Sequence, residues 1–275
     1  MISSEIKLLS KQFSAAGIEN ADFEAAELAA HVLDVDKATL LAMYTDELAE
    51  EKQVWLKALA ERRISGEPLQ YIIGKWDFYA LSMRCGEGVL IPRPESERLV
   101  DLAKGFVKKG QKIADLCAGS GCIGIATALK TAAHCTSIEL SEKAFSYLNQ
   151  NISANNAGGL VTAVLGDVLD EAADYGSFDG IFANPPYLSS RDMTELQKEV
   201  SFEPEMALFG GETGFEFYER LIPLWEKRLK KGGIFAVEIG INMHEKISGI
   251  FADSGLSPQI FKDYNGIERI VYAVK

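Results

Sequence analysis

The sequence lacks the features that mark membrane and exported proteins. No stretch approaches about 18 consecutive apolar residues, so no transmembrane helix is predicted. The first residues, MISSEIKLLSKQFSAAG, carry charges within their apolar pattern, which indicates an amphipathic helix and not a signal peptide. We therefore expect a cytoplasmic protein that does not associate with membranes.

Potential metal ligands are also scarce. There are only three histidines, well separated in the chain, and four cysteines, Cys85, Cys117, Cys122 and Cys135, without a C-x-x-C pair. Zinc sites usually show such closely spaced pairs, so we expect no bound metal. Unpaired thiols of this kind are typical of reduced, buried cysteines in the cytosol.

The sequence contains fewer basic than acidic residues. The chain has 28 Lys plus Arg against 40 Asp plus Glu, which gives a net charge of −12. Neutralisation of phosphates supplies most of the affinity of proteins for nucleic acids, so this balance argues against direct nucleic-acid binding. Two short basic runs, at 104–112 and 226–233, end helical patterns, where lysines complement the helix dipole.

The 275 residues, 47% of them hydrophobic, suffice for one large domain or two smaller ones. Apolar residues recur at helical spacing in three early segments, 3–16, 22–34 and 47–64. Gly66 and Pro68 then break the pattern. We expect a helical domain at 1–74 and a second domain at 75–275, which begins with a linking hairpin at 75–90.

From residue 112 onward, predicted strands and helices alternate. Strand patterns cover 112–118, 133–140, 160–167, 178–184 and 232–240, and helical patterns cover 122–131, 141–156 and 213–230. Ser141 is placed as a helix N-cap. This alternation predicts an α/β fold with a parallel, Rossmann-like sheet covered by helices on both faces. Residues 258–275 predict a hairpin around Asn265-Gly266, which we expect to add an antiparallel edge strand.

A glycine-rich turn follows the first of these strands. Gly119-x-Gly121-x-x-Gly124 lies between a strand and a helix, as in dinucleotide-binding proteins. Glycines let the backbone approach a ligand closely, and the helix N-terminus offers free amides. Nicotinamide or flavin dinucleotides and S-adenosylmethionine all bind at such turns, so the turn alone leaves the cofactor open.

Polar residues close four consecutive strands: Asp115, Glu139, Asp167 and Asn184. In an open parallel sheet ligands bind at this edge. Glu139 is placed to accept hydrogen bonds from ribose hydroxyls, and Asp167 to help hold adenine. Asp115 would repel a pyrophosphate but could accept a hydrogen bond from an ammonium group. S-adenosylmethionine carries an ammonium and a sulfonium and no phosphate, so these acids favour it.

The sequence Asn184-Pro185-Pro186-Tyr187 ends the fourth strand. The prolines hold the backbone rigidly. The Asn184 side-chain carbonyl and the Pro185 backbone carbonyl can accept the two hydrogens of a planar nitrogen, an amide or an aromatic amine, and Tyr187 can stack on it. Such contacts would direct the nitrogen lone pair toward an electrophilic methyl group.

NPPY after such a glycine turn resembles enzymes that methylate planar nitrogens, adenine methyltransferases among them. The rest of the chain narrows the likeness to the PrmC/HemK family of peptide chain release factor glutamine methyltransferases. The segments that carry it are LIPRPESE (90–97), NPPYLSS (184–190), FEPEMALFGGETGFEFYERLI (202–222), VEIG (237–240) and DYNGIERIV (263–271). The resemblance covers nearly the whole chain and is most specific from residue 90 onward.

The resemblance implies a class I methyltransferase, monomeric, that methylates the glutamine of the release factor GGQ motif on its side-chain nitrogen and leaves S-adenosylhomocysteine. It implies that Asn184 to Tyr187, with Arg93, bind the glutamine. It places the cofactor at Cys117, Ala118, Gly119, Ser120, Gly121, Glu139 and Val168. Three positions depart from the family pattern: Cys117 stands where glycine is common, Glu139 where aspartate is usual, and Met243 where glutamine is frequent.

Other functions fit the sequence less well. A nucleobase methyltransferase shares NPPY but usually needs a basic or base-recognising domain, whereas the first 75 residues hold 13 acidic and 8 basic residues, a net charge of −5. A non-catalytic scaffold would not need the intact glycines and NPPY. A dinucleotide-dependent oxidoreductase would leave NPPY unexplained.

Overall fold

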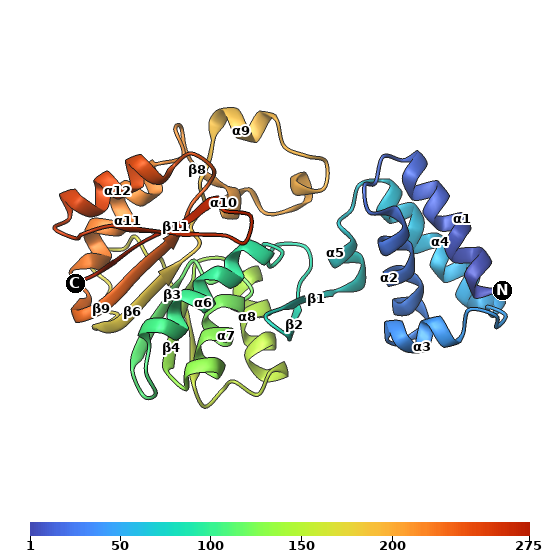
Figure 1. Cartoon of the computed structure of the whole chain (residues 1–275), viewed down its shortest axis with the longest axis horizontal. Coiled ribbons are helices and arrows are strands. Elements are labelled where there is room, and N and C mark those ends of the chain that lie inside the picture. Colours follow the sequence, from blue (N-terminus) through green and yellow to red (C-terminus); the bar gives the residue numbers. More distant parts are fainter. The chain divides into compact units, whose positions relative to one another are not determined.

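The computed structural model describes residues 1–275 and divides into two compact units. We call residues 1–74 together with 197–202 the helical unit, and residues 75–196 together with 203–275 the sheet unit. Both are drawn in Figure 1. None of the helices combines the length and the apolar composition needed to cross a membrane.

The helical unit contains α1 (Ile2–Ala15), α2 (Ala21–Leu33), α3 (Lys37–Ala42), α4 (Glu50–Ile64) and α5 (Leu69–Ile73). The three helices predicted from apolar periodicity are confirmed as α1, α2 and α4. Arg63 of α4 is buried and pairs with Glu24 at 2.5 Å and with Glu199 at 3.0 Å. Through Glu199, this ion pair attaches the segment 197–202, which includes the 3₁₀ turn η2 (Val200–Phe202), to the helical unit.

The sheet unit begins with an antiparallel hairpin that is shorter than the 75–90 segment. Its strands are β1 (Lys75–Phe78) and β2 (Leu81–Arg84), with Trp76 opposite Met83. The chain then runs without regular structure to the 3₁₀ turn η1 (Pro94–Ser96), and α6 (Glu97–Phe106) follows directly.

The central sheet has seven strands in the order β10-β11-β9-β6-β3-β4-β5. Their bounds are β3 (Lys112–Leu116), β4 (His134–Glu139), β5 (Val161–Leu165), β6 (Phe178–Ala183), β9 (Leu229–Glu238), β10 (Gln259–Lys262) and β11 (Glu268–Val274). Strands β9, β6, β3, β4 and β5 are mutually parallel. The predicted parallel α/β sheet is thus confirmed.

The terminal hairpin forms and adds an antiparallel edge strand, as predicted. β11 pairs antiparallel with β9 inside the sheet, and β10 forms the edge. Burial explains this order: Ile270, Val271 and Ala273 of β11 are fully buried, whereas β10 contains no buried residue. The turn is also wider than Asn265-Gly266, because the Asp263 carboxylate accepts hydrogen bonds from the amides of Asn265 and Ile267.

Helices cover both faces of the sheet (Figure 1). Helices α6, α7 (Cys122–Thr131) and α8 (Glu142–Ala154) pack on one face, and α11 (Glu216–Glu226) and α12 (His244–Asp253) on the other. Successive strand residues serve opposite cores: Ile181 belongs to the core under α11 and α12, and Phe182 to the core under α6 to α8. The short elements β7 (Leu188–Ser189), α9 (Ser190–Thr194), α10 (Glu205–Leu208) and β8 (Phe209–Gly211) follow NPPY.

Candidate functional site

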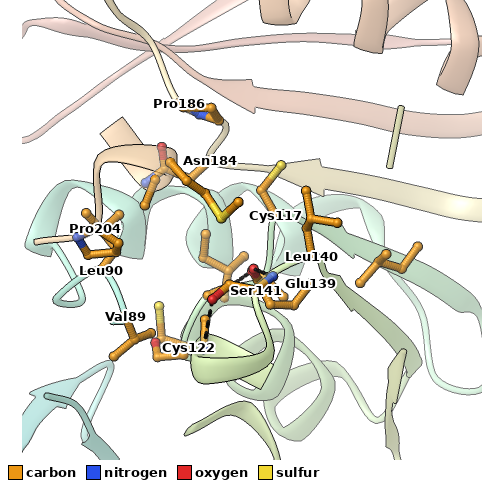
Figure 2. Close-up of a pocket in the computed structure, with 18 of the residues that line it drawn as sticks. Val89, Leu90, Cys117, Cys122, Glu139, Leu140, Ser141, Asn184, Pro186 and Pro204 are labelled. Atoms are coloured by element: carbon orange, nitrogen blue, oxygen red, sulfur yellow. Dashed lines mark hydrogen bonds between the residues drawn. The ribbon is translucent and has the colours of Figure 1, made fainter. Parts of the chain in front are cut away.

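A pocket lies in the sheet unit at the carboxyl ends of β3, β4, β5 and β6 (Figure 2). The residues predicted from sequence that line it are Arg93, Cys117, Ala118, Gly119, Ser120, Glu139, Asp167, Val168, Asn184 and Pro186. Further walls come from Gly88, Val89, Leu90, Ile91, Pro92, Leu140, Ser141, Pro204, Met206, Ala207 and Phe217. None of the three histidines lines it.

Four of the predicted site residues do not line this pocket: Asp115, Gly121, Pro185 and Tyr187. Asp115 differs most from expectation, since its side chain lies beneath the glycine turn and is only 1% exposed. Its Oδ2 accepts hydrogen bonds from the Gly124 amide at 2.9 Å and from Ser137 Oγ at 3.4 Å. Burial raises the pKa of Asp115 to about 8, against the lowering effect of these two donors. Asp115 therefore supports the turn from below.

The turn between β3 and α7 bends through left-handed backbone at Cys117 (φ 56°) and Gly119 (φ 54°). At a residue other than glycine, such as Cys117, this conformation costs roughly 1–2 kcal/mol. Burial, together with the charges of Glu139, Asp115 and Asp167, raises the pKa of the Cys117 thiol far above its ordinary value. Cys117 is thus a neutral thiol and contributes shape, not reactivity.

Glu139 ties the turn to the next helix. Its Oε2 accepts a hydrogen bond from the Gly119 amide and its Oε1 one from the Ser141 amide, both at 2.7 Å. Ser141 in turn caps α8 by accepting from the Ala144 amide at 3.3 Å, as predicted. Each carboxylate oxygen keeps a further lone pair with which it can accept a ligand hydroxyl.

The polar lining of the pocket contains one basic side chain. Arg93 forms an ion pair with the buried Glu203, whose other oxygen accepts from the Ile91 amide at 2.9 Å. Glu139 and Asp167 are the acidic residues of the lining. No group of three or more His, Cys, Asp or Glu side chains in the protein is arranged so that it could hold a metal ion.

Asn184 is connected to two buried side chains from other elements. Its Nδ2 donates to Ser96 Oγ at 3.2 Å, and Ser96 Oγ donates to Glu238 Oε2 at 2.6 Å. Ser96 ends η1 and Glu238 ends β9, and they are 2% and 3% exposed. Burial raises the pKa of Glu238 to about 7. With Nδ2 engaged in this way, Oδ1 is the amide atom left to accept hydrogen bonds from a ligand.

NPPY is held from behind by the segment that contains β8. A Cβ atom at Gly210 would lie 2.6 Å from the Pro186 carbonyl oxygen and 2.7 Å from Tyr187 Cα, so only glycine permits this approach. Tyr187 is partly buried against the apolar core under α11 and α12 and is not one of the residues that line the pocket. Burial raises its pKa to about 12, which keeps the phenol neutral.

Ser96, Glu203 and Glu238 belong to the site although no role for them was predicted from the sequence. The residues lie in LIPRPESE, FEPE and VEIG, which carried the resemblance, but no local spacing connects them. Ser96 and Glu238 are 142 positions apart, and Arg93 and Glu203 are 110 apart. Only the folded sheet unit brings them together.

Comparisons with known proteins agree with this architecture. Residues 6–74 match the family model of the PrmC N-terminal domain, and residues 96–219 match that of conserved hypothetical protein 95. A release factor glutamine methyltransferase from Thermodesulfovibrio yellowstonii is 38% identical over 261 residues, 92% of this chain and 92% of that protein. Another from Geobacter sulfurreducens is 34% identical over 93% of this chain and 90% of that protein.

Among solved structures, a methyltransferase from Pyrococcus furiosus has the same fold, with a TM-score of 0.53 at 20% identity, over 80% of this chain and 96% of that one. The identity and coverage of the sequence relatives are the stronger finding, because they extend over both units of the chain. The chain belongs to the release factor glutamine methyltransferase family.

Proposed function

We propose that the protein transfers a methyl group from S-adenosylmethionine to the side-chain amide nitrogen of the glutamine in the GGQ motif of peptide chain release factors, and releases S-adenosylhomocysteine. Family membership supports the substrate. The structural observation that carries the chemistry is Asn184, whose Oδ1 is left as an acceptor in the pocket beside the glycine turn.

The pocket fits S-adenosylmethionine better than a dinucleotide. Its one basic side chain, Arg93, is already paired with Glu203, so no free cation is present to hold a pyrophosphate. Glu139 and Asp167 suit hydroxyl and amino groups, and Val89, Leu90 and Ile91 supply an apolar wall. A Cβ atom at Gly119 would meet nothing within 4 Å, so the turn leaves room above it. S-adenosylmethionine, when bound, supplies an electrophilic methyl group.

Asn184 would orient the nitrogen that receives the methyl group. Its Oδ1 and the Pro185 carbonyl can accept the two amide hydrogens of the substrate glutamine, which directs the nitrogen lone pair away from them. The same acceptors stabilise positive charge as it develops on nitrogen. An amide is too weak an acid for an ordinary carboxylate to deprotonate. We therefore propose that the proton leaves after transfer, without a strong general base.

We also propose that the helical region 1–74 recognises the protein substrate. It contributes no residue to the pocket, yet it exposes large apolar side chains, with Leu41 61% and Val54 66% exposed. Surface apolar groups of this size suit a protein partner better than a phosphate backbone. We expect a monomeric cytoplasmic enzyme that binds neither metal nor nucleic acid.

The test is methyl transfer from labelled S-adenosylmethionine to a purified release factor, with DNA and ribosomal RNA as competing acceptors. Label should enter the release factor and be absent from a variant whose GGQ glutamine is replaced by alanine. Incorporation into nucleic acid in preference to the release factor would instead support the nucleobase alternative. Unchanged labelling of the alanine variant would refute the proposed target atom.

A further inference from the structure

The two ends of an asparagine side chain have nearly the same shape but opposite hydrogen-bonding character. Oδ1 accepts and Nδ2 donates, so rotation of the amide by half a turn exchanges them. Only the orientation with Oδ1 toward the substrate can bind the N–H groups of glutamine. The reversed orientation would set donor against donor. The activity proposed above therefore requires something that fixes the Asn184 amide.

Two buried side chains next to Asn184, Ser96 and Glu238, can fix the orientation of its amide, because together they determine which atom donates each hydrogen bond. An ionised Glu238 can only accept, so Ser96 Oγ must donate its single proton to Glu238 Oε2, at 2.6 Å. The Ser96 oxygen can then only accept from Asn184, and the partner at 3.2 Å must be Nδ2. Both side chains are almost fully buried, so bulk water does not compete for these bonds.

We propose that Ser96 and Glu238 are positioning residues that fix the Asn184 amide with its oxygen toward the substrate nitrogen. The inference rests on the proposed function, because it assigns Asn184 the acceptor role. Neither residue needs to touch the substrate. Glu238 sets the direction of the Ser96 hydroxyl, and the hydroxyl sets the direction of the amide.

We call the two hydrogen bonds from Asn184 to Ser96 and from Ser96 to Glu238 the relay. Both bonds keep this donor-to-acceptor direction only while Glu238 is ionised. A protonated Glu238 could donate to Ser96, whose own proton could then turn to Asn184 Oδ1 and favour the reversed amide. The charged or titratable groups that interact electrostatically with Glu238 are Glu95, Arg93, Arg269, Tyr187, Tyr218 and Cys122. Burial raises the pKa of Glu238, Glu95 raises it further, and the Ser96 hydroxyl and both arginines lower it, to about 7 in balance. The wild-type kcat should therefore fall as the pH is lowered through about 7.

The first test compares Ser96→Ala and Glu238→Gln with a matched control, Thr127→Val. Thr127 is a fully buried hydroxyl residue of α7 that does not line the pocket. Loss of the relay should lower kcat roughly five- to tenfold, the value of one internal hydrogen bond, with KM and cofactor affinity within about twofold. The acid limb of the kcat profile should disappear in Glu238→Gln. Losses no greater than in Thr127→Val, or an acid limb that persists in Glu238→Gln, would overturn the inference.

A second test asks whether Ser96 acts through Asn184. In Asn184→Asp the side chain has two equivalent oxygens, so its orientation no longer matters. Ser96→Ala should then cost clearly less in the Asn184→Asp background than in the wild type. An equal fold-loss in both backgrounds would mean that Ser96 acts on the substrate or on the fold, and the positioning role would be wrong.

A third measurement does not depend on activity. The side-chain NH₂ signals of Asn184, assigned by their absence in Asn184→Asp, should exchange slowly with solvent in the wild type and faster in Ser96→Ala. This result would hold even if the substrate were not a release factor, so failure of the proposed function and failure of the relay are distinguishable. Unchanged exchange in Ser96→Ala would refute the relay itself.

Discussion

Replacement of Asn184 gives the most direct test of the site. Asn184→Ala removes the acceptor that faces the pocket and leaves Ser96 without its donor. Loss of one preorganised polar group at a reacting centre costs about 3–4 kcal/mol, which is roughly a 10²- to 10³-fold fall in kcat. Stability should change by only about 1 kcal/mol, the value of one hydrogen bond. Cofactor affinity should change little.

Asn184→Asp separates the acceptor role from the presence of an amide. Aspartate keeps an acceptor oxygen but cannot donate to Ser96, and it adds a negative charge close to the buried Glu238. We expect an intermediate enzyme, at least about tenfold more active than Asn184→Ala, because the oxygen that orients the nitrogen survives.

The assay is single-turnover methyl transfer to release factor, with cofactor affinity from calorimetry and folding from thermal melting. Asn155→Ala is a suitable control, since Asn155 is also half-buried and hydrogen-bonded but contributes nothing to the pocket. If Asn184→Ala and Asn184→Asp were equally inactive while folded and cofactor-bound, Asn184 could not act as the acceptor.

Three further outcomes follow from the structure. Gly119→Leu should abolish S-adenosylmethionine binding in calorimetry, because its side chain would enter the pocket from a left-handed position; unchanged affinity would remove the cofactor from this turn. Deletion of residues 1–74 should impair methylation of intact release factor far more than of a short GGQ peptide, whereas equal losses would mean a purely structural role. For Asp115, whose folded pKa of about 8 exceeds the ordinary 3.8, the unfolded state loses its proton first as the pH rises. Denaturant titrations should therefore show the free energy of unfolding falling by up to about a few kcal/mol between pH 4 and 8, and falling less in Asp115→Asn; equal slopes would contradict the raised pKa.

The architecture and the strand-end location of the site could be predicted because both depend on local pattern. Alternating strands and helices fix a parallel sheet, and the residue after each strand then falls at its ligand-binding edge. Glu139, Asp167 and Asn184 were placed at the pocket by this reasoning. The terminal hairpin at the edge was predicted as well, but which of its strands lies outermost depends on burial from both sides, which the residue sequence of a single strand does not reveal.

Side-chain direction set the second limit on prediction. Asp115 and Tyr187 belong to motifs at the correct edge, but one points under the glycine turn and the other into the core below α11 and α12. The position of a residue in a motif predicts where its Cα atom lies but does not predict the direction in which its side chain points. The hydrogen bonds of the relay could not be predicted from the sequence for another reason. Ser96 lies 88 positions from Asn184, and its partner Glu238 lies 142 positions beyond Ser96.

The arrangement of buried carboxylates suggests why a neutral amide stands at the reacting centre. Methyl transfer from a sulfonium to a nitrogen moves one positive charge without creating another, so the site needs alignment more than additional charge. Asp115 and Glu238 are accordingly turned away from the pocket, where they hold an amide and a hydroxyl. The group left to meet the substrate is an uncharged oxygen whose direction is set by its buried neighbours. Substitutions that preserve charge but loosen this direction should therefore lower kcat, although the acceptor oxygen of Asn184 itself is unchanged.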